Sequence, residues 1–325
     1  RLEKEEDFLS GVIVLNQEIF QLPAPDFTAS QLFIDVSMRF VYLLSADKTL
    51  AYYDFDKKRL LYEQLPSNIV DAKLLLGGIS LLVAEQSGVV SQWFPVLEDG
   101  SRRLKKIRSF SANSASKNLI LATENRRKGF VTARADGSLQ IFHSTAESKV
   151  LEEVLFDLPV ESLAVSPRAN RLLAVDESGH LYIFAIENEH PEVSWTSLWK
   201  KLWYESYPEP TYTWQSSSSS NDFEPKLSLS PLAFGTLKAA FYAMLLGAPL
   251  AICGAIYTAY FMNAKMRGKV KPLIELMEAL PTVILGFLAG LWLAPFLEQH
   301  LVGIFSLLLL LPPAILLVSF LASKL

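Results

Sequence analysis

The sequence predicts a mixed fold, in which an all-β, propeller-like amino-terminal region precedes an all-α region of transmembrane helices. Two observations predict this division. Hairpin-forming segments recur at a period in the forties before residue 195, and long uncharged apolar runs follow residue 228. We expect residues 1–194 to form the propeller-like domain, residues 195–228 an aromatic segment and linker, and residues 229–325 the transmembrane helices.

Charge and hydropathy are distributed unevenly along the chain. Of the 325 residues 50% are hydrophobic, and the mean hydropathy of +0.25 is higher than that of an ordinary soluble protein. Beyond Leu227 the chain has six basic and three acidic residues, which leaves 24 basic and 31 acidic residues before that point. The first part is therefore acidic and polar, and the second part is apolar and slightly basic.

Four segments share one pattern, an apolar strand, a polar turn and a second strand with aromatic residues. They are residues 41–55, 81–96, 130–142 and 172–184. Their turns align on Lys48, Gly88, Gly137 and Gly179, which recur at spacings of 40, 49 and 42 residues. Glycine suits three of these turns because it reaches positive φ without a Cβ penalty.

A period in the forties that is built from hairpins predicts propeller blades of the WD40-like type, since a single blade cannot bury both of its faces alone. Four blades are visible, which is near the lower limit for a closed ring. Either the ring is incomplete in this chain, or residues 1–30 contribute strands that the pattern does not place.

An aromatic segment follows the last repeat. Trp195, Trp199 and Trp203 recur every four residues, so on a helix they would share one face. Such a face suits the headgroup level of a membrane, and packing against the propeller-like domain is the alternative. The next stretch, with prolines and five consecutive serines, predicts a flexible linker and a domain boundary.

Few features point to chemistry. A run of five basic residues between Arg102 and Arg108 could attract a polyanion, but its surroundings are acidic and we expect a solvated loop between blades. The sequence has no GxxxxGK[ST] loop, no metal-ligand spacing of cysteine and histidine, and no catalytic triad. We expect no catalytic residues, no metal, no cofactor and no nucleic-acid partner.

Three apolar runs are long enough to cross a bilayer, since about 20 helical residues cover its hydrocarbon core. They are residues 239–262, 279–297 and 301–323. The loop predicted after the first run carries Lys265, Arg267, Lys269 and Lys271 and no acidic residue, so by the positive-inside rule it is cytoplasmic. The propeller-like domain then lies on the periplasmic side of a multi-pass protein in the bacterial inner membrane.

Glu275 and Glu278 are three residues apart and would share a helix face at the start of the second span. They could complement the dipole of a helix that begins near Pro272, or they could line a translocation path or dock a cytoplasmic partner. Pro281 interrupts the same span. Lys238, near the outer end of the first span, could snorkel to the lipid interface or guide an anion.

Two stretches, joined by the basic loop, carry a resemblance to a known family: EPKLSLSPLAFGTLKAAFYAMLLGAPLAICGAIYTAYFM and IELMEALPTVILGFLAGLWLAP. Their order and spacing resemble the inner-membrane permease of the phosphate-specific ABC transporter, of the MetI-like, binding-protein-dependent superfamily. There, a Gly-Thr-Leu opening is followed by a glutamate-led helix bearing a proline. The resemblance covers about a quarter of the chain, and the large preceding domain is similar to a long variant of the family.

The resemblance implies a transport subunit in the membrane lipid that imports inorganic phosphate and performs no catalysis itself. It implies three partners: a second permease subunit, a cytoplasmic ATP-binding subunit dimer and a periplasmic phosphate-binding protein. The sequence stops before a loop of the E-A-A type, which docks the ATPase in the family, so we expect a piece of a longer polypeptide. A second hypothesis is a membrane-anchored propeller that acts as a scaffold or sensor. A third, a tethered quinoprotein-type enzyme, is disfavoured because acidic residues and histidines are not clustered.

Overall fold

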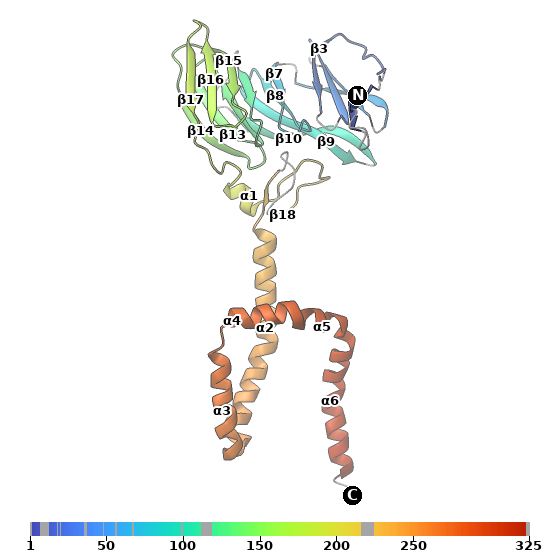
Figure 1. Cartoon of the computed structure of the whole chain (residues 1–325), viewed down its shortest axis with the longest axis vertical. Helices are drawn as coiled ribbons and strands as arrows, with labels where there is room; N and C mark the ends of the chain where they lie inside the picture. The colour runs from blue at the N-terminus through green and yellow to red at the C-terminus, as the bar shows by residue number, and fades with distance from the viewer. Residues whose placement is uncertain are drawn as a thin grey trace. The chain divides into compact units, whose positions relative to one another are not determined.

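The computed structural model describes residues 2–6, 13–17, 19, 21–35, 38–47, 49–55, 57–66, 68–98, 100–111, 119–215 and 224–322. They belong to two compact units, Arg1–Lys238 and Ala239–Leu325 (Figure 1). Lys48, one of the four aligned turn positions, and the serine run at 216–220 lie outside the described residues.

The first unit contains four consecutive antiparallel sheets in which neighbouring strands are also neighbours in sequence (Figure 1). The first sheet consists of β3 (Ala29–Ile34), β4 (Phe40–Ser45), β5 (Thr49–Asp54) and β6 (Arg59–Gln64). The second consists of β7 (Ile69–Leu74), β8 (Leu81–Glu85), β9 (Val89–Glu98) and β10 (Ser101–Ser111). The third consists of β11 (Ile120–Thr123), β12 (Gly129–Ala133), β13 (Ser138–His143) and β14 (Ser148–Val154). The fourth has three strands, β15 (Val160–Val165), β16 (Arg171–Asp176) and β17 (Leu181–Ala185).

Four such sheets packed in chain order are the blades of a β-propeller, which confirms the predicted fold class. The four hairpins expected from the repeat are β4–β5, β8–β9, β12–β13 and β16–β17. Gly88, Gly137 and Gly179 have φ angles of 83°, 77° and 84°, as their turns require. Before the first blade, β1 (Leu2–Glu6) and β2 (Ile13–Gln17) pair only with each other.

Side-chain alternation along each strand explains how the blades pack. Leu81 and Val83 of β8 join the core between the first two blades, whereas Leu82 and Ala84 join the core between the second and third. A blade with a neighbour on each face therefore buries almost every residue of its central strands, and β8 and β12 read as nearly continuous apolar runs.

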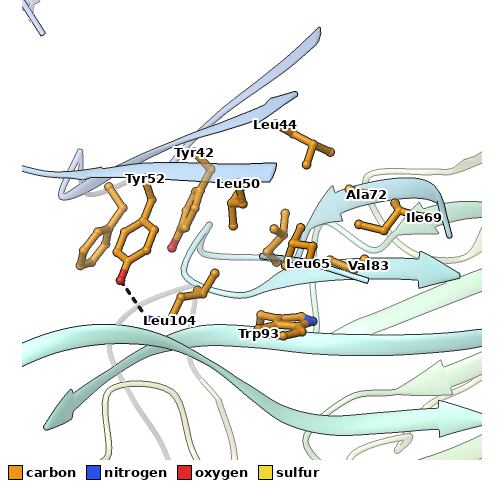
Figure 2. Close-up of a cluster of buried hydrophobic side chains, with 12 residues drawn as sticks. Tyr42, Leu44, Leu50, Tyr52, Leu65, Ile69, Ala72, Val83, Trp93 and Leu104 are labelled. Atoms are coloured by element: carbon orange, nitrogen blue, oxygen red, sulfur yellow. Dashed lines mark hydrogen bonds between the residues drawn. The ribbon is translucent and has the colours of Figure 1, made fainter. Parts of the chain in front are cut away.

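The core between the first two blades is rich in aromatic residues. Figure 2 shows Tyr42, Leu50 and Tyr52 facing Trp93 and Leu104 of the next blade. The Leu104 amide donates a hydrogen bond to the Tyr52 hydroxyl at 3.2 Å, which satisfies a polar atom inside this core.

A third core joins the last two blades. Its buried members come from both sheets and include Val131, Ile141, Leu172 and Ala174. The opposite face of the fourth blade is open, with Leu181 59% and Ile183 58% exposed.

The basic run at residues 102–108 was predicted as a solvated loop, and this prediction is wrong. These residues form the middle of β10, paired with β9 through a bulge between Lys106 and Arg108. Leu104 and Arg108 point inward and are buried, while Arg103 and Lys106 are exposed. The alternation of a strand places four basic residues toward solvent or the sheet edge and one in the interior.

Three helical stretches are long and apolar enough to cross a membrane, as the sequence predicts: Ser230–Phe261, Thr282–Gln299 and Leu301–Ala322. The first comprises α2 (Ser230–Ile256) and the π-helical turn η1 (Tyr257–Phe261). The second comprises α4 (Thr282–Leu288), η2 (Ala289–Leu293) and α5 (Ala294–Gln299). The third is α6 (Leu301–Ala322), and α3 (Ala264–Glu278) lies between the first two.

Candidate functional site

The basic segment after the first span is a helix and not the predicted loop. Lys265, Arg267, Lys269 and Lys271 all lie in α3. Asn263 begins this helix, because its side-chain oxygen accepts a hydrogen bond from the Lys265 amide at 3.1 Å. An N-cap residue followed by good helix formers such as lysine, methionine and arginine explains why the chain coils here.

One of the four basic residues supports the end of the preceding helix. The Arg267 guanidinium donates hydrogen bonds to the carbonyls of Ala259 and Met262 at 2.8 and 3.1 Å. These carbonyls lie at the end of η1, where no amide of the same helix is available to donate a hydrogen bond to them. Lys265, Lys269 and Lys271 are exposed and carry the remaining positive charge of α3.

The two glutamates lie at the carboxyl end of α3, not at the start of a span. α3 ends at Glu278, the Ala279 amide bonds to the Glu275 carbonyl at 3.2 Å, and Pro281 is the N-cap of α4. Carboxylates are unfavourable near a helix carboxyl terminus, so the interpretation that they complement a helix dipole is wrong. The break has a physical cause, because Pro281 lacks an amide donor and disfavours helix in the residue before it.

The remaining candidate, Lys238, lies in α2 and is exposed. It belongs to the first compact unit, while the other candidates belong to the second. Glu275, Glu278 and Pro281 lie close to one another in sequence, on either side of the break between α3 and α4.

The tryptophan segment forms only a five-residue helix, α1 (Trp195–Trp199), which begins with a capping box between Ser194 and Ser197. Lys200 is extended, with φ −102° and ψ 160°, so Trp203 does not continue the helix face predicted for the three tryptophans. Trp195 is 75% exposed, whereas Trp203 packs edge-on against Phe94 of β9 at 6.4 Å.

The chain after α1 is tied to the second and third blades by a buried ion pair. Lys128 Nζ lies 2.6 Å from Glu205 Oε2 and also donates to the Leu76 carbonyl at 2.5 Å. The other oxygen of Glu205 accepts a hydrogen bond from Ser80 at 2.5 Å. Burial raises the pKa of Glu205, while Lys128 opposes this rise.

A second set of polar contacts lies beside this pair. Arg108 donates to the carbonyls of Ser144, at 2.8 Å, and Trp203. Glu224 accepts hydrogen bonds from the Thr145 hydroxyl and, at 2.9 Å, from the Glu205 amide. Burial lowers the pKa of Arg108, and nearby Glu224 and Glu147 oppose this lowering.

These buried charged groups depend on one another for their stability. Unpaired charges are expensive to bury, so Lys128 and Arg108 of the blades and Glu205 and Glu224 of the later chain stabilise one another only while both sides are in place. The polar cluster around Lys128 and Glu205 is not among the sites predicted from the sequence. Two signals could have indicated it: Lys128 comes directly before a buried strand, and Glu205 lies between Tyr204 and Tyr207.

Among the described residues, no group of three or more histidine, cysteine, aspartate or glutamate side chains is placed to hold a metal ion. The arrangement around α3 offers charge and a broken helix rather than a reaction centre. Such features suit binding and conformational change in a membrane.

No family model matches the chain. A relative is found among curated proteins: the probable ABC transporter permease protein YqgH of Bacillus subtilis (strain 168) is 33% identical over 78 residues. The match covers 24% of this chain and 25% of the relative, so the chain spans about a quarter of the length of the curated protein it matches. The partial likeness to a permease, together with three apolar helices, is compatible with a transport subunit.

Among solved structures, the chain is similar to the Myceliophteria thermophila Cps50 (Swd1) beta-propeller domain. The identity is 17%, the TM-score is 0.43, and the likeness covers 56% of this chain and 62% of that one. The propeller fold itself follows from the strand order and the cores between blades described above.

Proposed function

We propose that this chain forms part of the transmembrane path of an ABC importer for inorganic phosphate. The observation that carries the proposal is the 33% identity over 78 residues to a probable ABC transporter permease. Three candidate spans in the same chain give it the means to cross the membrane. Phosphate as the substrate rests on the resemblance of the FGTLKAAF and IELMEALP segments to the phosphate-specific permeases.

In this role the chain alternates between conformations that open toward one side of the membrane or the other, and its partners bias that equilibrium. A cytoplasmic ATP-binding dimer hydrolyses ATP, a second permease subunit completes the path, and a periplasmic phosphate-binding protein delivers the substrate. The propeller is then an accessory periplasmic module in a bacterial inner-membrane protein.

We place α3 on the cytoplasmic side, because Lys265, Lys269 and Lys271 are exposed on it between two candidate spans. Glu275 and Glu278 lie at the end of this helix, where the dipole does not favour them. Their occurrence at an unfavourable position supports a role in the path or in docking a cytoplasmic partner, with Pro281 at the break between α3 and α4. Lys238 at the other end of the first span is the candidate for guiding the anion inward.

Purification of the tagged full-length protein from detergent-solubilised membranes tests this function. We expect stoichiometric recovery of a nucleotide-binding subunit with a P-loop and of a second permease subunit. Substitution of Glu275 by Gln should reduce recovery of the nucleotide-binding subunit, whereas the matched change Glu298→Gln in α5 should not. Recovery of signalling proteins without an ATP-binding subunit would instead support the alternative function, a membrane-anchored scaffold or sensor.

A further inference from the structure

A cavity of about 1190 Å³ opens between the third and fourth blades. Its walls come from the β11–β12 turn, the β15–β16 turn, the chain after β17 and the end of β13. Arg126, Arg168 and His143 are among the groups on these walls that could donate hydrogen bonds to a ligand. None of them takes part in the polar cluster around Lys128 and Glu205.

His143 lines the cavity although its side chain is only 1% exposed. Its Nδ1 accepts a hydrogen bond from the Ala146 amide at 3.2 Å, so a neutral ring carries its proton on Nε2. Within the described part of the chain, Nε2 has no hydrogen-bond partner. A donor without a partner that lines a cavity is available to an acceptor atom of a ligand or of solvent.

His143 is kept neutral by its surroundings. Burial, followed by Arg127, Arg108 and Lys128, lowers the pKa of His143 to about 3. The ring therefore stays neutral at physiological pH, while these three cations are themselves paired with or close to Glu124, Glu205 and Glu224.

The rim of the cavity carries both signs of charge. Arg127 is held by Glu124 at 3.0 Å and by the Asn188 carbonyl, and His190 is held by Glu192 at 3.3 Å. The exposed guanidinium groups of Arg126 and Arg168 have no hydrogen-bond or ion-pair partner among the described residues. Arg126 lies on the β11–β12 turn and Arg168 on the β15–β16 turn. The acidic residues Glu187, Glu189 and Glu192, on the chain after β17, also line the cavity.

We propose that this cavity binds a small oxyanion, a phosphate or a carboxylate group, through the guanidinium groups of Arg126 and Arg168 and the Nε2–H group of His143. Guanidinium groups match the geometry of both oxyanions and bind them with charge-assisted hydrogen bonds. This site is independent of the transport path and does not depend on the proposed transport function.

Isothermal titration of the purified full-length protein with sodium phosphate, sulfate and acetate, each at the same ionic strength, tests the proposal. We expect saturable binding of at least one anion with a Kd of about 1 mM or lower. Arg126→Gln combined with Arg168→Gln should weaken binding by about tenfold or more. Both side chains are exposed, so this variant should fold normally, which its melting temperature checks.

Two controls separate binding from general charge or folding effects. Arg171→Gln removes one exposed cation from the same sheet outside the cavity and should leave the affinity unchanged. His143→Asn keeps an acceptor for the Ala146 amide but loses the Nε2 donor, whereas His143→Gln restores a donor there, so binding should fall in the first and recover in part in the second. Absence of saturable binding for all three anions, or an equal loss in Arg171→Gln, would overturn the proposal.

Discussion

Lys128 Nζ and Glu205 Oε2 lie 2.6 Å apart, although the two residues are 77 positions apart in the sequence. Their side chains are 1% and 7% exposed. Because Lys128 precedes β12 of the third blade and Glu205 follows α1, this pair binds the chain that leads to the first span to the propeller. The pair therefore ties the chain at Glu205 to the third blade.

Removing one partner of this pair should destabilise the first unit strongly. Lys128→Met leaves the Glu205 carboxylate buried without its cation, which costs about 3–5 kcal/mol. The measurement is the free energy of unfolding from denaturant titration of the full-length protein, followed by tryptophan fluorescence. Trp203, which lies two residues from Glu205, is one of the six tryptophans that contribute to this signal.

Two comparisons make this first prediction specific. Lys149→Met removes a cation from a surface pair with Glu152, whose side chains are 34% and 35% exposed, and should cost less than about 1 kcal/mol. Lys128→Met combined with Glu205→Leu should cost less than the sum of the two single changes. Additive costs would show that the two groups do not stabilise each other.

Gly137 and Gly179 provide a matched pair of turn positions. Both have positive φ, at 77° and 84°, but a Cβ at Gly137 would lie 1.9 Å from the Phe156 carbonyl oxygen, while one at Gly179 meets nothing within 4 Å. Gly179→Ala should therefore cost about 1–2 kcal/mol, the penalty for the left-handed conformation. Gly137→Ala adds a backbone clash and should lower the melting temperature clearly further. Equal losses would contradict the position of β13 against the chain at Phe156.

His143 should make stability depend on pH. Its pKa is about 3 in the folded protein, against the ordinary histidine value of 6.5, so below pH 6.5 the unfolded chain binds a proton that the folded protein does not. Stability present above pH 6.5 is thus lost as the pH falls toward 3, by about 2 kcal/mol between pH 7.5 and pH 5. His143→Asn should reduce this slope, as measured by denaturant titration at both pH values in a buffer without oxyanions. Identical slopes in the two proteins would contradict a neutral, buried His143.

The orientation of the spans can be tested with single cysteines in a Cys253→Ser background, since Cys253 is the one native cysteine. Ser218→Cys should react with a membrane-impermeant maleimide added from the periplasmic side. Lys269→Cys in α3 should react only after lysis, because we place this basic helix in the cytoplasm. The reverse pattern of labelling would invert the proposed topology.

The sequence predicts the repeated blades well because hairpin patterns are local. Apolar strand segments and, at three of the four turns, a glycine at positive φ specify the hairpins without reference to the rest of the chain, and uncharged length alone identifies the three spans. The extent of α3 was harder to predict, because a basic, polar segment between spans reads as a loop until Asn263 is recognised as its N-cap.

Contacts between distant segments were not predictable from such patterns. Arg108 appears as one of five similar basic residues, and only the register of β10 against β9 decides that it points inward. The pairing of Lys128 with Glu205 and the cavity beside His143 depend on how blades and later segments pack, which no local periodicity encodes.

Uptake of radiolabelled phosphate by intact cells tests the central claim, that this chain belongs to a phosphate-importing permease, most directly. A strain that lacks the gene should lose high-affinity uptake, and the restored gene should recover it, while Glu275→Gln should recover only part. Wild-type phosphate uptake in the deletion strain, with other phosphate transporters removed, would contradict the claim.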